Sequence, residues 1–138
     1  MSEQKIQKSE FFDAKLQGES FLIRILQNPT DESQMHEFFQ LHESKLKEIK
    51  TTKKTRMFLD LSELSFSATL LFYIPPLLKH FLRLQPESNR KLKACSVCVS
   101  NSYAASIIQP YLEKYPGEVP TFISSDEEAC RQFLRRAK

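Results

Sequence analysis

Two short apolar-rich runs stand near the start of the chain, and a polar connection separates them. The runs cover Phe11 to Leu16 and Ser20 to Leu26, and Gln17-Gly18-Glu19 lies between them. Short runs joined by a glycine-containing turn are typical of a β-hairpin. We therefore expect two antiparallel strands in this region.

A helical period follows the predicted hairpin. Pro29-Thr30-Asp31 offers a side chain that can cap a helix, and apolar positions then recur at helical spacing. These positions are Met35, Phe38, Phe39, His42, Leu46 and Ile49. After a polar, basic loop, Met57 to Leu61 is a short apolar run that predicts a strand.

A second helical stripe runs from Leu70 to Leu82 and continues through Pro75 and Pro76. Proline inside a helix removes a hydrogen bond and costs ~3 kcal/mol. The stripe therefore fits either one kinked helix or a short first turn followed by a new helix that begins near Pro76. Both interpretations agree with the pattern.

The last third of the chain contains two more strand and helix pairs. Leu92 to Val99 predicts a strand, and Asn101-Ser102 can cap a helix that Pro116-Gly117 ends. Val119 to Ile123 predicts the last strand, and Ser125 to Glu128 has the form of a capping box. The final helix is expected to turn three side chains inward: Ala129, Cys130 and Phe133.

This order of elements predicts an α/β fold with about four helices. Strands that alternate with helices form right-handed βαβ units and a mostly parallel sheet, and the hairpin at the start is its expected antiparallel edge. A chain of 138 residues is typical of one domain. We assign residues 1–7 to a flexible N-terminus and residues 8–138 to a single domain.

Composition and charge exclude several function classes. The 20 Lys and Arg residues exceed the 17 Asp and Glu residues by only +3, which gives little general attraction for nucleic acid. Only 2 glycines are present, too few for a glycine-rich phosphate loop.

Leu64 to Leu78 is uncharged but too short to span a bilayer, and residues 1–10 lack the apolar core of a secretory signal. The odd number of three cysteines fits reduced intracellular thiols better than a disulfide framework, so we expect no structural disulfide. Together with the absence of a membrane-spanning or secretory pattern, this predicts a cytoplasmic protein without membrane insertion.

Catalytic and metal-binding patterns are weak. His36 and His42 lie six positions apart on one predicted helix and project from different sides, so solvated or half-buried histidines are expected, His80 included. Cys95 and Cys98 have a spacing found in zinc and redox sites, but they point to opposite faces of a strand. Core thiols are the favoured interpretation. No nucleophile is paired with a base, so we expect no enzyme activity, metal or cofactor.

The stretch from Met57 to Phe66, which opens directly into the second predicted helix, resembles the central strand and loop of STAS domains, the anti-sigma factor antagonists of bacteria. The element order and the stretch Ser125 to Ala129, similar to the closing helix start of that family, extend the resemblance over most of the chain. The resemblance implies a STAS-like fold and a non-enzymatic regulatory module, acting in signal transduction and transcription regulation as a monomer or weak dimer. The implied partners are proteins: a Ser/Thr kinase, a phosphatase or an anti-sigma-like factor.

In the STAS family this loop reads Asp-Ser-Ser-Gly, and its first serine is phosphorylated. The register places residues 68–71 on these positions, so Thr69 takes the acceptor position while Ala68, Leu70 and Leu71 replace the other three. A shift of one or two residues makes Ser67 the acceptor instead. The implied partner-binding loop comprises Asp60, Ser62, Ser65, Phe66 and Ala68.

Simpler or different interpretations of the same segments stay open. Ser67 can cap the helix with Thr69 facing solvent, although the helix dipole would also favour a phosphate there. Leu70 to Leu84 is unusually apolar, which would suit a small-ligand or lipid carrier whose helix covers a pocket. The basic stretches Lys45 to Arg56 and Arg131 to Lys138 are expected to be solvated faces, with phosphate or membrane-surface binding as the alternative.

Overall fold

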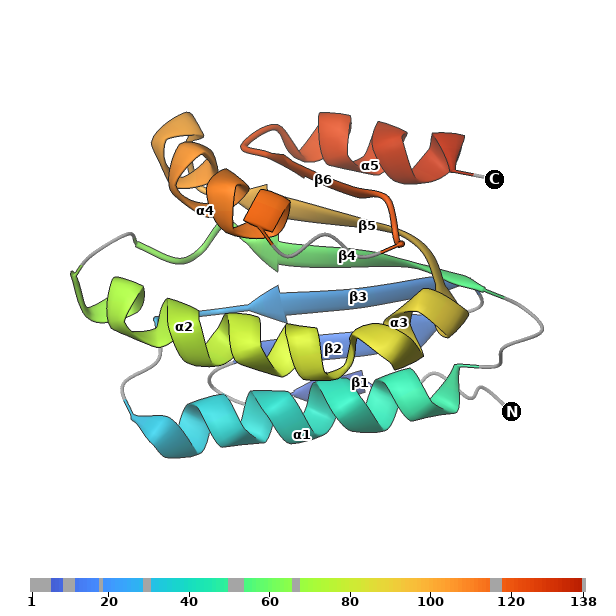
Figure 1. The fold of residues 1–138 in the computed structure, drawn as a ribbon, viewed down its shortest axis with the longest axis horizontal. Helices are drawn as coiled ribbons and strands as arrows, with labels where there is room; N and C mark the ends of the chain where they lie inside the picture. Colours follow the sequence, from blue (N-terminus) through green and yellow to red (C-terminus); the bar gives the residue numbers. More distant parts are fainter. Residues whose placement is uncertain are drawn as a thin grey trace.

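The computed structural model describes residues 6–8, 12–17, 19–28, 31–49, 54–65, 68–114 and 118–137. Three strands open this part of the chain, and helices separate the strands that follow (Figure 1). The strands are β1 (Ile6–Lys8), β2 (Phe12–Gln17), β3 (Ser20–Ile25), β4 (Thr55–Leu61), β5 (Leu92–Val99) and β6 (Thr121–Ser124). The helices are α1 (Glu32–Glu48), α2 (Ala68–Arg83), α3 (Gln85–Lys91), α4 (Ser102–Lys114) and α5 (Glu127–Arg136).

The strands form one sheet with the order β1-β2-β3-β4-β5-β6. The first three strands are antiparallel neighbours, whereas β3, β4, β5 and β6 are parallel to one another. The predicted α/β class, the hairpin and the mostly parallel sheet are therefore confirmed. The predicted strands at Met57 to Leu61 and Leu92 to Val99 are buried neighbours, and Leu59 pairs with Val97.

Two short elements were not predicted. β1 extends the sheet by one strand, so the antiparallel edge is β1 and not the first strand of the hairpin. α3 adds a helix between α2 and β5. Its sequence, Gln-Pro-Glu-Ser-Asn-Arg-Lys, has no apolar stripe, and no side chain caps its start.

The side chains of the strands divide the core into two layers. On the first face of the sheet, residues such as Phe21, Leu59 and Val97 join one large cluster with α1, α2 and α4. On the second face, Phe58, Ala94 and Cys98 pack with α5. This division follows from the alternation of side chains along a strand, and it places the helices α1–α4 on one face and α5 on the other.

The helix boundaries confirm most of the predicted caps. The carboxylate of Asp31 accepts the amide of Gln34, and the side chain of Asn101 accepts the amide of Ala104. The capping box at Ser125 is wrong by one residue. Asp126 is the N-cap of α5, because its carboxylate accepts the amides of Glu128 and Ala129 at 2.9 and 3.3 Å.

The α2 helix is continuous through Pro75 and Pro76, as the one-helix interpretation predicted. Both prolines lie on its exposed side, where water can satisfy the carbonyl groups that lose an amide partner. None of the helices in the described part of the chain has the length and apolarity needed to cross a bilayer.

Candidate functional site

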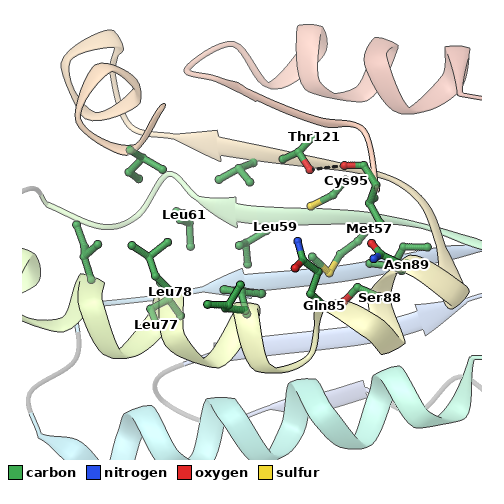
Figure 2. Close-up of a pocket in the computed structure, with 17 residues that line it drawn as sticks. Met57, Leu59, Leu61, Leu77, Leu78, Gln85, Ser88, Asn89, Cys95 and Thr121 are labelled. Carbon is green, nitrogen blue, oxygen red and sulfur yellow. Dashed lines mark hydrogen bonds between the residues drawn. The ribbon is translucent and has the colours of Figure 1, made fainter. Parts of the chain in front are cut away.

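A cavity of about 190 Å³ lies between the first face of the sheet and the helices α2, α3 and α4 (Figure 2). An engineered cavity of about 150 Å³ in another protein is large enough to bind benzene. The cavity therefore has the capacity for a small organic molecule.

The floor of the cavity is made by the parallel strands β4, β5 and β6, of which β6 is the edge of the sheet. Alternate residues of β4 point into it, followed by residues of β5 and β6. They are Met57, Leu59, Leu61, Cys95, Val97 and Thr121. The walls come mainly from α2 and α4. Their side chains are Ile74, Leu77, Leu78, Phe81, Leu82 and Ile108.

One titratable side chain, the thiol of Cys95, lines the cavity among the described residues. Burial, with a smaller contribution from Cys130, raises the pKa of this thiol to about 12. The thiol is therefore neutral at physiological pH. The cavity offers apolar contact and no charge.

Polar side chains gather at the end of the cavity next to α3. Figure 2 shows Gln85, Ser88 and Asn89 on one side and Leu61, Leu77 and Leu78 on the other. Asn89 is already engaged, because its side-chain oxygen accepts the amide of Glu118 at 3.1 Å. The side chains of Gln85 and Ser88 have no hydrogen-bond partner in the described part of the chain.

A buried histidine pair lies between α1 and α2, beside this site. The Nδ1 atom of His42 is 2.9 Å from the Nε2 atom of His80, and the two side chains are 0% and 4% exposed. Phe38 and Phe39 stack against the rings. The expectation of solvated or half-buried histidines is wrong for these two residues and right for His36, which is exposed.

Desolvation dominates the titration of this pair. Burial, together with the smaller effects of His80 and Arg83, lowers the pKa of His42 to about 3. Burial and the charge of Arg83 lower the pKa of His80 to about 4, against an opposing effect of Glu43. Both rings are neutral at pH 7. The Nε2 atom of His42 is buried and has no hydrogen-bond partner among the described residues.

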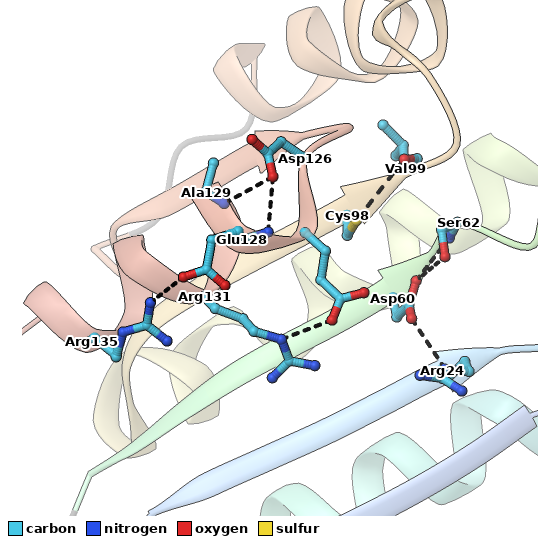
Figure 3. A network of polar contacts seen from close by, with 11 residues as sticks. Arg24, Asp60, Ser62, Cys98, Val99, Asp126, Glu128, Ala129, Arg131 and Arg135 are labelled. Carbon is cyan, nitrogen blue, oxygen red and sulfur yellow. Dashed lines mark hydrogen bonds and ion pairs between the residues drawn. The ribbon is translucent and has the colours of Figure 1, made fainter.

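The predicted partner-binding loop is only partly described. Asp60 is buried at the end of β4, and its carboxylate forms an ion pair with Arg24 at 3.1 Å. The same carboxylate accepts hydrogen bonds from the amide and the hydroxyl of Ser62, so these two predicted residues lie together (Figure 3). Ser65 is exposed, and its backbone forms two hydrogen bonds with the side chain of Asn28.

The candidate phosphoacceptors lie at the start of α2. Thr69 and Ala68 are in its first turn, and their side chains lie outside the description. Ser67 and Phe66 lie outside the described residues. The structure therefore brings Asp60 and Ser62 into one network, in which Asp60 is buried and ion-paired with Arg24.

The three cysteines are free and buried. Cys95 belongs to the core cluster of the first face, whereas Cys98 and Cys130 belong to the cluster of the second face, so the predicted core thiols on opposite faces are confirmed. Burial raises the pKa of Cys98, with Asp60 contributing, and raises that of Cys130 to about 12. In the described part of the chain, no three His, Cys, Asp or Glu side chains are grouped so that they could hold a metal ion.

Two aromatic side chains are strongly exposed near the carboxyl ends of the parallel strands. Phe72 on α2 is 76% exposed, and Tyr103 in the first turn of α4 is 68% exposed. Both helices begin directly after a parallel strand, at the edge of the sheet where α/β proteins usually bind ligands.

Comparison with known proteins identifies the fold. No protein-family model matches the chain, and no curated protein sequence matches it. A crystal structure of an uncharacterized protein of the DUF3478 family from Shewanella loihica PV-4, which has a SpoIIAA-like fold, matches with a TM-score of 0.54. The chain has a SpoIIAA-like fold. This is the fold of STAS domains, and the likeness covers 95% of this chain and 91% of the other at 17% identity.

Proposed function

We propose that the protein is a non-enzymatic binding protein that holds a small, largely apolar ligand in the cavity between the sheet and the helices α2, α3 and α4. The observation that carries this proposal is the cavity itself, with apolar walls and no charged side chain among its described lining residues. Ligand pockets in proteins are mostly apolar, with a few polar groups at fixed positions.

The cost of an empty cavity supports the proposal. Protein interiors are close-packed and keep few voids larger than a water molecule. A cavity lined by apolar side chains lacks the contacts that these side chains would make in a close-packed interior. An apolar ligand would offset this cost by restoring the missing contacts, whereas water would find few polar partners there.

A dye-binding titration with two neighbouring variants tests the proposal. Ile108 lines the cavity, whereas Ile107, the preceding residue of α4, does not. We expect wild-type protein and Ile107→Phe to bind the neutral dye N-phenyl-1-naphthylamine equally, and Ile108→Phe to bind it at least about tenfold more weakly because the added ring occupies the cavity. Circular dichroism checks that both variants fold. Equal dye binding by both folded variants would contradict the proposal. In a separate experiment, mass spectrometry of an organic extract of the purified protein would identify a ligand that co-purifies.

A second candidate function is the regulatory one implied by the STAS resemblance. The exposed side chains of Phe72 and Tyr103 support it, because large exposed aromatics are frequent at protein interfaces. In this proposal a Ser/Thr kinase, a phosphatase or an anti-sigma-like factor binds the edge formed by the starts of α2 and α4. Phosphorylation of Thr69, or of Ser67, would then weaken the complex.

A pull-down with mass spectrometry tests this second candidate and reads both bound proteins and phosphosites. Charge entering a desolvated contact costs about 2 kcal/mol or more, so Thr69→Glu should lower the affinity for a captured partner at least about thirtyfold. The fold should persist, because the helix dipole favours negative charge in the first turn. Equal affinity of wild type and Thr69→Glu would remove Thr69 as the switch, and Ser67→Ala tests the alternative acceptor.

A further inference from the structure

The cavity has a polar end and an apolar end. Gln85 and Ser88 line it from α3, and Leu61, Leu77 and Leu78 line the opposite end near the carboxyl ends of the strands (Figure 2). A molecule that fills the cavity therefore meets the polar side chains of Gln85 and Ser88 at one end and leucine side chains at the other.

The polar groups at this end are uncharged. Gln85 and Ser88 are half-buried, and their side chains have no hydrogen-bond partner in the part of the chain that the structure describes. By contrast, the neighbouring Thr121 hydroxyl donates to the carbonyl of Val119 at 3.0 Å. A side-chain amide and a hydroxyl can each donate and accept, so together they suit a ligand group that does both.

The charged side chains near α3 are occupied elsewhere. Lys91 donates to the carbonyl of Leu46 at 3.0 Å and pairs with Glu87 at 2.9 Å, and Arg90 also pairs with Glu87. None of these three residues lines the cavity. A charged ligand group would therefore gain no counter-charge in exchange for the water that it loses, which disfavours its burial.

We propose that this cavity selects ligands with an apolar body and an uncharged polar head, such as an alcohol or a primary amide, with the head bound by Gln85 and Ser88. This inference rests on the proposed ligand-binding function and names the ligand class for the same site.

Three probes with the same six-carbon chain test the inference: 1-hexanol, hexanoate and hexylammonium. We expect 1-hexanol to bind at least about tenfold more tightly than either ion at pH 7, measured by amide chemical-shift titration. The side-chain amide signals of Gln85 should move when 1-hexanol binds. Gln85→Leu and Ser88→Ala should each reduce the preference for the alcohol.

A charge introduced at the polar end gives the sharpest test. Gln85→Glu places a carboxylate at the first residue of α3, where the helix dipole tolerates it. This variant should bind hexylammonium at least about tenfold more tightly than wild type does, whereas Gln132→Glu on the exposed side of α5 should not.

The outcomes separate this inference from the proposed function. If all three probes bind equally well, and Ile108→Phe abolishes their binding, the cavity binds ligands but the head-group inference is wrong. An unchanged preference in Gln85→Glu would also overturn it. If no probe binds and the neutral dye does not bind either, the proposed function and the inference fail together.

Discussion

The two faces of the sheet are built differently. On the second face a single helix, α5, is fixed at both ends. Asp126 caps its start (Figure 3). At its end, Arg56 from β4 donates to the carbonyls of Leu134 and Ala137 at 2.7 Å each. On the first face, several helices cover the sheet, and a cavity remains beneath α2, α3 and α4.

Small side chains explain the close contact of α5 with the sheet. Ala94, Cys98 and Cys130 are 0%, 3% and 0% exposed, and their size lets the helix approach the strands. The Arg131 guanidinium lies 4.8 Å from the ring centre of Phe58, which completes the layer. The comparison indicates that α5 packs closely on the second face, whereas the first face holds the larger core cluster and also contains the cavity.

Acid should produce the largest difference between the faces. The pKa values of His42 and His80 are lowered in the folded state to about 3 and about 4, from an ordinary 6.5. Between pH 6.5 and these lowered pKa values, the unfolded chain therefore binds more protons than the folded chain. The stability that the two neutral histidines contribute is complete above about pH 6.5 and is lost as the pH falls toward 3. At pH 4 we expect a loss on the order of 3 kcal/mol or more relative to pH 7.

Urea unfolding between pH 4 and pH 7 measures this loss. His42→Leu combined with His80→Leu should flatten the pH dependence, whereas His36→Ala, which alters an exposed histidine, should leave it unchanged. Because the pair lies between α1 and α2, hydrogen exchange at pH 4 should increase there before it increases in α5. A pH profile that is the same in wild type and the double variant would show that other groups control acid stability.

Loss of the hydrogen bonds from Arg56 to the end of α5 should have the next largest effect on the free energy of unfolding. Arg56→Met takes away two hydrogen bonds from a charged donor and leaves the carbonyls at the end of α5 without that partner. We expect a loss of about 2 to 3 kcal/mol in the free energy of unfolding. Arg135→Met is the matched control on α5, since its ion pair with Glu128 is exposed and exposed pairs contribute about 0 to 1 kcal/mol. Similar losses in both variants would refute the anchoring role.

Much of the fold could be predicted because it follows from local patterns. The strand at Leu92 to Val99 has its predicted bounds, and the caps at Asp31 and Asn101 lie where expected. The misplaced cap of α5 shows the limit of such patterns, because Ser125 and Asp126 are both good N-cap residues. Only the geometry of the turn decides that the Asp126 carboxylate reaches the free amides.

Long-range contacts account for what could not be predicted. His42 and His80 are 38 positions apart, so nothing local relates them, although His42 occupies an apolar stripe position. Lys45 and Arg56 belong to a stretch expected to be solvated, yet Lys45 is 2% exposed and Arg56 binds α5. The cavity lining likewise consists of residues that any core could use, and the void arises only from how α2 and α4 are placed over the sheet.

A pair of enlarged side chains tests the contrast in packing most directly, with the smallest expected effects. Ala94→Val adds volume to the close-packed second face, where overpacking typically costs about 1 to 3 kcal/mol. Ile108→Phe adds volume on the first face, where the cavity can accept it, so we expect a change within about 0.5 kcal/mol or a small gain. Urea unfolding followed by circular dichroism measures both. If Ile108→Phe were as destabilising as Ala94→Val, the first face would be as tightly packed as the second, and the case for a binding cavity there would lose its physical basis.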